Sequence, residues 1–341
     1  MSTVTIKDVA SAANVSIATV SRVLNKNYYV SPDLEQKVQA AIRELGYYPN
    51  SVARSLKIQS TMAIGFLVSD ISNNFFTSVS RAVEDNIRLH NFHLLVCSTD
   101  HDKEREREYL QVLLEKKVDG IIINTTGFND EFISSISEKV PIALLSRRIM
   151  TANIIGDLVD SDNVRGSYDL TSYLLSLGHR KIGFVNGPNH VSSAIERYEG
   201  FQRAMAKAGA DLEEPYRYYV DSTFSFDGGY QGARILTERA DRPTAVIFAN
   251  NEMGAGGLRY FNAHHVRVPE DISVACYDRI VNDDLLYIHP TYVTMDPGLI
   301  GRTLSDFIVD RIQHKNDLNS IANREVRFPA RLVPGNGTRQ L

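Results

Sequence analysis

The feature that most constrains this chain is an alternation of short apolar runs with longer amphipathic stretches, which runs from residue 61 to residue 341. The apolar runs occupy residues 63–68, 94–97, 120–123, 142–145, 181–185, 217–220, 245–248 and 272–276. The amphipathic stretches occupy residues 75–90, 103–117, 164–177, 193–208, 227–239 and 252–263. Strands that are apolar on both faces and alternate with helices predict parallel sheets with helices on both sides. We therefore expect an α/β fold for this region, the body of the protein.

The length of the body predicts two lobes. Residues 61–341 hold more strand–helix units than one compact sheet accommodates. Two similar lobes of roughly 130 residues fit better, because most domains hold about 100–150 residues. We place the boundary between the lobes near Asp160.

The first 46 residues, the head, contain only helical patterns. Apolar residues repeat at the spacing of one helix face between positions 6 and 13. Thr5 and Asp8 fit a capping box at the start of this helix. Asn14 tolerates the left-handed backbone of a tight turn, and Ser16 can cap a second helix.

A third helix follows in the head. Ser31 and Pro32 are an N-cap and a first helical residue, and Gly46 ends the apolar periodicity. Two short helices joined by a tight turn, with a third packed against them, predict a helix-turn-helix domain over residues 1–46. A small helical domain that contacts other proteins is the alternative.

The charge distribution favours nucleic acid as the partner of the head. Residues 1–60 carry seven Lys and Arg and four Asp and Glu, a net charge of +3. The remaining residues carry 30 basic and 37 acidic side chains, a net charge of −7. A basic head on an acidic body is typical of a chain whose head contacts a polyanion.

The second helix is the candidate for the major groove of DNA. Short polar side chains there suit phosphate contacts, and Arg22 can bond in two places to guanine. Ile17 and Ala18 can contact only a thymine methyl group or read the shape of the groove. The DNA-binding candidates in the head are Thr5, Ser16, Ile17, Ala18, Thr19, Ser21, Arg22, Asn25 and Tyr29.

Residues 47–60 form a separate connecting segment. Asn50 is a good N-cap, Ala53 permits close helix approach, and Leu56 can act as an apolar wedge in a minor groove. So short a helix is not stable alone in water, so it is expected to form only when it is paired and docked. A flexible tether is the alternative.

Long motifs in the chain resemble those of one family. Residues 4–10 with 15–25, and the hinge-like segment 47–56, are similar to the N-terminal signature of the lactose-repressor/galactose-repressor (LacI/GalR) family. The resemblance continues through residues 71–76, 178–184, 197–201, 250–254 and 268–274. Asn14 stands where the family usually has glycine, and Asn74 where proline is frequent. Neither change removes the resemblance.

The resemblance implies a homodimeric transcription regulator, most often an induced repressor. Each head would read half of a pseudo-palindromic operator, and paired hinge helices over 47–60 would insert Leu56 into the central minor groove. Because a pyrimidine–purine step opens most cheaply, we expect a central CG step. No leucine heptad tail precedes the end of the sequence, so we expect a dimer rather than a tetramer formed through such a tail.

The resemblance also implies a body like a periplasmic sugar-binding protein, with an effector between the lobes. Residues 61–160 and 292–325 would form the first lobe, and residues 161–291 and 326–341 the second. Effector-binding candidates follow the predicted strands, where α/β folds bind ligands. They are Phe75, Phe76, Arg148, Arg197, Phe224, Asn250 and Asp278. For each there is a structural alternative, such as a turn cap for Asp278 or a core position for Phe76.

Two departures from the family affect the expected effector, a sugar or sugar derivative. Ser146 stands where the family often has Asp, and Arg279 where an acid or amide is frequent. With Arg147 and Arg148 adjacent to Ser146, the cleft could be basic. A phosphorylated or acidic sugar is therefore one hypothesis for the effector.

The sequence contains no enzyme signature that we recognise. It has no Gly-x-Ser-x-Gly elbow, no Walker loop and no Gly-x-Gly-x-x-Gly motif. Two cysteines can build neither a disulfide framework nor a four-thiolate metal site. We expect no metal site and no cofactor. No apolar run approaches the length of a membrane span and no secretory signal is evident, so we expect a cytoplasmic protein that joins the nucleoid at its operator. A regulator that answers to a protein corepressor and a sugar-processing enzyme are the alternatives.

Overall fold

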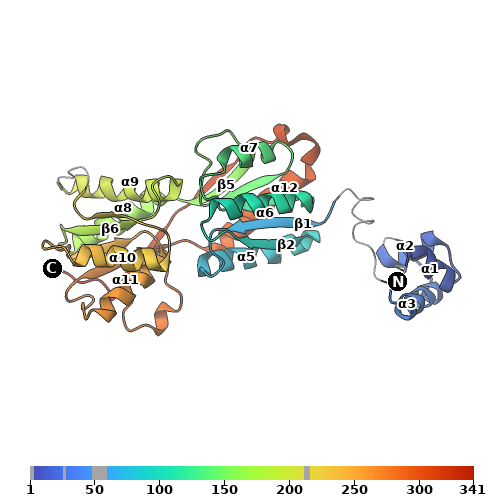
Figure 1. Ribbon diagram of the computed structural model, residues 1–341, viewed down its shortest axis with the longest axis horizontal. Helices are drawn as coiled ribbons and strands as arrows, with labels where there is room; N and C mark the ends of the chain where they lie inside the picture. Colours follow the sequence, from blue (N-terminus) through green and yellow to red (C-terminus); the bar gives the residue numbers. More distant parts are fainter. Residues whose placement is uncertain (1–3, 26–27, 48–59, 211–215) are drawn as a thin grey trace. The chain divides into compact units, whose positions relative to one another are not determined.

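The computed structural model describes residues 4–25, 28–47, 60–210 and 216–341. The chain divides into two compact units, Met1–Thr61, which includes the head, and Met62–Leu341, which is the body (Figure 1). Each unit has its own hydrophobic core.

The head contains three helices, α1 (Ile6–Ala12), α2 (Ile17–Asn25) and α3 (Pro32–Leu45). Their ends follow the local signals in the sequence. The Thr5 backbone N–H and hydroxyl both donate to Asp8, at 2.8 and 2.7 Å. Asn14 has a φ of 51°, and the Thr19 backbone N–H donates to the Ser16 hydroxyl at 3.1 Å. The helix-turn-helix arrangement that we expected is therefore present.

The core of the head is small. It consists of Val9, Ala10, Ala13, Val20, Val23, Val38, Ala41 and Tyr47. These side chains come from all three helices and from Ala13 and Tyr47, which lie shortly after α1 and α3, so the three helices stabilise one another.

The first lobe of the body contains a sheet of six parallel strands in the order β11-β5-β4-β3-β1-β2. The strands are β1 (Ala63–Val68), β2 (His93–Ser98), β3 (Gly120–Ile123), β4 (Ile142–Leu145), β5 (Gly156–Ser161) and β11 (Glu325–Phe328). Its helices α5 (Asn74–Ile87) and α12 (Pro297–Gln313) share one core cluster with alternate residues of β1, β3 and β4. Helices α6 (Lys103–Glu115) and α7 (Asp130–Ser137) share another with the opposite face.

The second lobe has the strand order β12-β10-β9-β8-β6-β7, parallel except for the antiparallel pair of β10 and β12. Its strands are β6 (Ile182–Asn186), β7 (Tyr219–Asp221), β8 (Ala245–Phe248), β9 (Ser273–Tyr277), β10 (Thr291–Thr294) and β12 (Arg331–Val333). Helices α8 (Asn163–Ser176) and α9 (Ser192–Lys207) cover one face of the sheet, and α10 (Phe226–Thr237) and α11 (Asn251–Ala263) the other (Figure 1). The predicted α/β class with a helical head and a two-lobed body is confirmed.

Three segments join the lobes, and their positions correct the expected lobe limits. Strand β10 lies in the second sheet, so the chain returns to the first lobe after Thr294 rather than at residue 292. Strand β11 pairs with β5 as far as Phe328, so the last crossing follows residue 328 rather than 325. Strand pairing sets both limits, and these short edge segments lack the apolar pattern of the inner strands.

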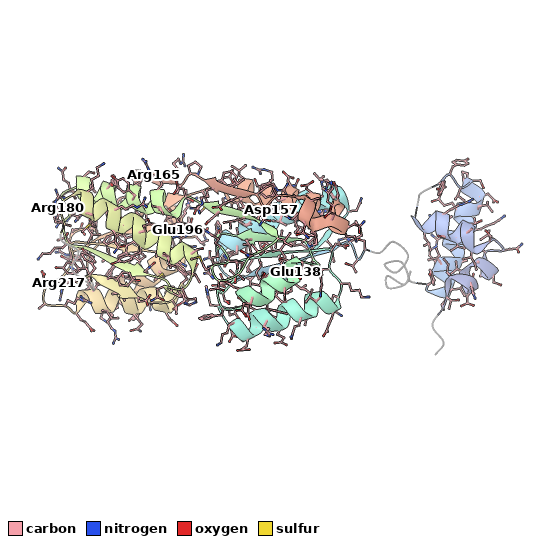
Figure 2. All side chains as sticks on the ribbon, turned by 90° about the horizontal axis from the view of Figure 1, so that it is seen from above. Glu138, Asp157, Arg165, Arg180, Glu196 and Arg217 are labelled. Atoms are coloured by element: carbon pink, nitrogen blue, oxygen red, sulfur yellow. The ribbon has the colours of Figure 1, made fainter. Side chains whose placement is uncertain are left out.

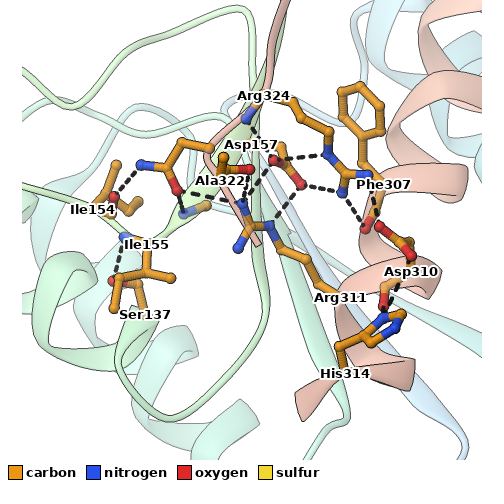
Figure 3. A network of polar contacts seen from close by, with 12 residues as sticks. Ser137, Ile154, Ile155, Asp157, Phe307, Asp310, Arg311, His314, Ala322 and Arg324 are labelled. Carbon is orange, nitrogen blue, oxygen red and sulfur yellow. Dashed lines mark hydrogen bonds and ion pairs between the residues drawn. The ribbon is translucent and has the colours of Figure 1, made fainter. Parts of the chain in front are cut away.

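A buried ionic network fixes the last helix of the first lobe to its sheet (Figure 3). Arg311 of α12 donates to Asp157 of β5 at 2.7 and 2.8 Å, and both side chains are fully buried. Arg324 donates to the same carboxylate and to Asp310. Burial alone would raise the pKa of Asp157, but the hydrogen bonds from Arg311 and Arg324 outweigh it and hold the pKa below its usual value. The network thus joins β5 to α12, two segments more than 150 residues apart in the sequence.

Close packing of α12 on α5 depends on a glycine. A Cβ atom at Gly301 would lie 2.6 Å from the Cβ of Ala82, closer than two non-bonded carbon atoms can approach.

Among the described residues, no helix is both long and apolar enough to cross a lipid bilayer.

Candidate functional site

The head presents an exposed polar face around the start of α2. Thr5, Ser16, Ala18 and Arg22 are exposed, and Ile17 exposes 44% of its surface. The exposed part of the Ile17 side chain is available for contact with a partner. The exposed side chains therefore coincide with the residues predicted to face DNA.

The other candidates in the head are placed less uniformly. Thr19 and Ser21 are half-buried, and the Ser16 and Thr19 hydroxyls are 2.9 Å apart. Tyr29 exposes 89% of its surface in the connection before α3. Asn25 is the last residue of α2, but its side chain is not among those described, and Asn50, Ala53 and Leu56 lie outside the described residues.

The body contains a cleft at the carboxyl ends of strands from both sheets, which we call the interlobe cleft. Its walls enclose about 510 Å³ of empty space, which includes open solvent, and only about 50 Å³ of it admits the centre of a water-sized sphere. In this arrangement of the lobes the cleft is therefore narrower than the roughly 300–1,000 Å³ common for small-molecule sites. Its walls are Ser69, Asp70, Asn73, Phe75, Phe76, His101, Asn124, Ser146 and Arg147 from the first lobe, Ser193, Arg197, Phe224, Asn250, Asn251 and Asp278 from the second, and Met295 after β10.

Six of the seven effector-binding candidates line this cleft: Phe75, Phe76, Arg197, Phe224, Asn250 and Asp278. Arg148 does not. Its guanidinium forms an ion pair with Glu196, and its backbone N–H donates to Ser192 at 2.9 Å. Arg279 is also directed elsewhere, because it pairs with Asp283. Of the arginines that suggested a basic cleft, only Arg147 lines it.

Arg197 is held in place from three sides. Its Nε donates to the Asn163 side chain at 2.9 Å, and its Nη1 donates to the Ala249 carbonyl at 2.5 Å. Its guanidinium carbon lies 3.8 Å from the centre of the Tyr277 ring. A planar cation fixed in this way keeps its remaining N–H groups in a set direction for a ligand.

Asn250 and Phe76 also have structural roles. The Asn250 side-chain oxygen accepts from the Met253 backbone N–H at 2.8 Å and so caps α11. Phe76 belongs to the core cluster of the body and exposes only 8% of its surface. Both residues border the cleft while they stabilise the wall behind it.

Several acceptors in the cleft are unsatisfied. The Asn124 Oδ1, Ser146 Oγ and Asp278 Oδ1 atoms are buried and have no hydrogen-bond partner among the described residues. Buried polar atoms without partners are rare in folded proteins and require an explanation. A polyhydroxylated ligand would supply the missing hydrogen bonds to all three.

Three residues that line the cleft have a strained backbone. His101, Ser146 and Asp278 have φ angles of 60°, 57° and 68°, in the left-handed region that side chains other than glycine rarely adopt. Strained residues cluster where a side chain must be aimed at a ligand. Each of the three follows one of the strands β2, β4 and β9.

The electrostatics of the cleft are set by burial. Burial raises the pKa of Asp278 to about 6, although Arg197 acts in the opposite direction. Burial, with a further contribution from Arg147, lowers the pKa of His101 to about 4, so its ring is neutral at pH 7. No group of three or more His, Cys, Asp and Glu in the described part of the chain is placed to hold a metal ion.

Direct contacts join the lobes beside the cleft. The side-chain amides of Asn73 and Asn251 exchange two hydrogen bonds, of 3.1 and 3.0 Å, between α5 and α11. Glu196, labelled in the second lobe in Figure 2, binds Arg148 and lies 3.5 Å from Arg327, both from the first lobe. A movement of the lobes relative to each other would change these contacts.

Comparison with known proteins gives matches along the whole chain. The family described as "Bacterial regulatory proteins, lacI family" matches residues 5–50, and the "Periplasmic binding protein-like domain" matches residues 171–338. The HTH-type transcriptional repressor PurR of Photobacterium profundum is 33% identical over 92% of this chain and 93% of its own length. The chain belongs to the LacI family.

Solved structures of LacI-family regulators agree with this assignment. The lac repressor dimer bound to operator and the anti-inducer ONPF matches 99% of this chain and 100% of its own, with 26% identity and a TM-score of 0.82. A LacI-family regulator from Enterococcus faecium with bound ribose matches 82% of this chain and 99% of its own, with 30% identity and a TM-score of 0.72. These similar proteins are transcriptional regulators, not enzymes.

Sequence reasoning on this LacI-family chain missed part of the cleft. Asn73, His101, Asn124, Ser193 and Asn251 line it but were not candidates. His101 and Asn124 lie just beyond strand ends, as the recognised candidates do, and that position was the available signal. Ser193 lies on the first turn of α9 and reaches the cleft only because the lobes face each other.

Proposed function

We propose that this LacI-family protein is an operator-binding transcriptional repressor whose DNA affinity is switched by a small-molecule effector in the interlobe cleft. The observation that carries the proposal is that one chain has both an exposed helix end in its head and a cleft with unsatisfied acceptors in its body. The first suits a polyanion, and the second a small polar molecule.

The exposed start of α2 supports recognition of DNA in the major groove. Arg22 can form two hydrogen bonds with guanine, while Ser16 and Thr19 fix the position of the head through phosphates. The lac repressor, which is similar over nearly the whole chain, binds its operator as a dimer. We infer a homodimer on a pseudo-palindromic site, with Leu56 from both hinges at a central CG step.

The chemistry of the cleft supports a sugar or sugar derivative. Asp278 and Asn124 offer acceptors to hydroxyl groups, and Phe75 and Phe224 offer apolar faces to the C–H side of a sugar ring. The similar regulator from Enterococcus faecium binds ribose. Arg197, Asp278 and Phe224 are the residues that we expect to contact the effector most directly.

The switch follows from the position of the cleft. A ligand that binds one arrangement of the lobes more tightly than the other shifts the balance between them. In the dimer, movement of the first lobes would alter the spacing of residues 47–60, so that the hinge helices form or melt. Release of the operator on effector binding is the expected direction. The protein would act in the cytoplasm and join the nucleoid when bound to its operator.

The test begins by enriching sites from random duplexes with the full-length protein at near-physiological salt. We expect a pseudo-palindrome with a central CG step and an affinity that falls steeply as salt increases, because phosphate contacts dominate binding. Substitution L56A should weaken operator binding and reduce the bend. A protein with no preference for any palindrome would contradict the proposal, and DNA affinity that responds to a cell protein but to no metabolite would favour the corepressor alternative.

A further inference from the structure

We propose that the effector is a sugar carrying an anionic oxygen group, a carboxylate or a phosphate monoester, and that Arg147 is the residue that selects it. This inference rests on the proposed function, because it specifies the chemistry of the effector in the same cleft. It comes from two arginines whose charges the protein does not neutralise at close range.

Arg147 and Arg197 lie on opposite lobes and meet at the cleft. They expose only 6% and 7% of their surfaces. Their guanidinium carbons lie 5.5 and 5.7 Å from the centre of the same ring, that of Phe224. Two largely buried cations are therefore concentrated around one wall of the cleft.

Neither cation has an acidic partner at close range. Arg147 donates to the Thr125 carbonyl at 2.7 Å, and Arg197 donates to the Asn163 amide oxygen and the Ala249 carbonyl. Among the described residues, no carboxylate oxygen lies within ion-pair distance of either guanidinium. Buried arginines are rare unless an acid pairs with them.

Other arginines of the body show the usual arrangement. The fully buried Arg311 makes two hydrogen bonds to Asp157, and Arg148, next to Arg147 in the sequence, pairs with Glu196. The acid whose charge acts on Arg147 is Glu106, which is fully buried and accepts from Thr126 and Asn129. Arg147 is thus left with charge to offer to the cleft.

The protonation equilibrium of Arg147 agrees with this geometry. Burial, and then the charge of Arg197, lower the pKa of Arg147 to about 10, against a smaller opposing effect of Glu106. The guanidinium remains charged at pH 7 but is less stable than in water. An anionic group between the two arginines would relieve both the desolvation and the repulsion, and a neutral sugar would relieve neither.

The rest of the cleft requires hydroxyl groups as well as an anion. Asn124 Oδ1, Ser146 Oγ and Asp278 Oδ1 can accept hydrogen bonds that inorganic phosphate cannot supply to all three at once. The Asp278 carboxylate also repels a negative charge on its own side. The ligand should therefore carry its charge at the Arg147 end and its hydroxyls at the Asp278 end.

The experiment uses the full-length protein and matched series of hexoses, the corresponding hexuronates and the corresponding hexose 6-phosphates. Calorimetric titration should give at least one anionic sugar that binds 100-fold or more tightly than its neutral parent. The carboxylate and phosphate arms identify which group is recognised. The same compound should shift operator binding in a gel-shift assay.

Variants assign the preference to Arg147. Substitution R147Q should weaken binding of the anion at least tenfold and leave binding of the neutral parent within about threefold. Substitution R147K keeps the charge but not the planar guanidinium, so it should give an intermediate affinity. It also serves as a control in case R147Q fails to fold. The control R180Q removes an arginine at the end of the second lobe remote from the first (Figure 2) and should bind like the wild type.

Three results would overturn this inference while leaving the proposed function intact, provided that the protein still binds its operator. Neutral sugars could bind as tightly as their acids and phosphates. R147Q could bind the anion as tightly as the wild type. Finally, the sugars of the series and inorganic phosphate could raise the Tm of the wild-type protein by no more than they raise the Tm of R147Q.

Discussion

The head and the body of this LacI-family protein place comparable side chains in opposite environments. Arg22 of the head is exposed on a helix, with its guanidinium 5.7 Å from the ring centre of Tyr28. Arg197 of the body is buried and bonded to two acceptors. The same residue type is thus free to meet a partner in one region and integrated into the tertiary structure in the other.

This difference separates binding from stability in the head and joins them in the body. An exposed side chain that caps no helix adds little to the free energy of folding, so changing it should alter binding alone. A buried polar side chain contributes to folding through desolvation and hydrogen bonds, so changing it should alter both. Four predictions test this contrast.

The largest effect should come from the buried network of the first lobe. Substitution D157A would leave the fully buried Arg311 without its carboxylate, which typically costs about 3–5 kcal/mol. We expect the unfolding transition of the body to move by this amount while that of the head stays unchanged. Denaturant unfolding followed by circular dichroism measures both.

The control for this prediction is D85A, which removes the acid of an exposed pair with Arg81 on α5 of the same lobe. Exposed pairs contribute at most about 1 kcal/mol, so the body should be nearly as stable as the wild type. Equal effects of D157A and D85A would show that the network does not hold the lobe together.

The second effect concerns Asp278, whose pKa is raised to about 6 by burial. The native state binds more protons than the unfolded state between about pH 4 and 6, so this carboxyl group makes the protein less stable as the pH rises through that window. Substitution D278N removes this dependence. At pH 7 the variant should be more stable by about 2–3 kcal/mol, and at pH 4 the difference should vanish.

The same variant should bind the effector less tightly, because the amide replaces a charged acceptor. A combination of greater stability and weaker binding distinguishes a functional carboxylate from a structural one. If D278N were less stable than the wild type at pH 7, Asp278 would belong to the framework of the lobe and not to its binding site.

The third effect lies in the head. Substitution R22Q should weaken operator binding by about 1–3 kcal/mol and relax the preference at one base pair of each half-site. Unfolding of the head should not change, because the side chain is exposed. Gel-shift titration of base-substituted operators measures the preference, and R43Q on α3, also exposed, is the control.

The smallest effect should come from the cap of α2. The Ser16 hydroxyl accepts from the Thr19 backbone N–H, and loss of such a cap costs about 1 kcal/mol. Substitution S16A should lower the free energy of unfolding of the head by this amount, and S16T should restore most of it. Ser16 is also predicted to contact phosphate. Substitution S16T separates capping from phosphate contact, because threonine keeps the cap but has a different side-chain volume.

The local signals of the head were sufficient to place its helices. The capping residues Thr5, Ser16 and Ser31, the turn at Asn14 and the stop at Gly46 act within a few residues of themselves. Most inner strands of the body were equally clear, since parallel strands buried on both faces are commonly apolar throughout. The inner strands β5 and β10 and the edge strands β11 and β12 carry polar residues and were missed.

The cleft could be predicted only in part. Phe224, Asn250 and Asp278 were recognised because they follow strands, where an α/β fold brings distant loops to one edge. Arg148 was a wrong placement, because an arginine after a strand end can turn toward either the cleft or the opposite lobe. Its partner Glu196 lies 48 positions away, and nothing in the local sequence indicates that pairing.

Sequence alone determined most of the helices and strands of this protein, because caps, turns and apolar periodicity act over a few neighbouring residues. It therefore defined the helix-turn-helix head, the two sheets and the strand ends at which ligands bind. Only the tertiary structure decided which arginines face the cleft, where the chain crosses between lobes, and which acids remain buried. These outcomes depend on burial and on partners distant in the chain, and both come into existence only when the lobes have packed.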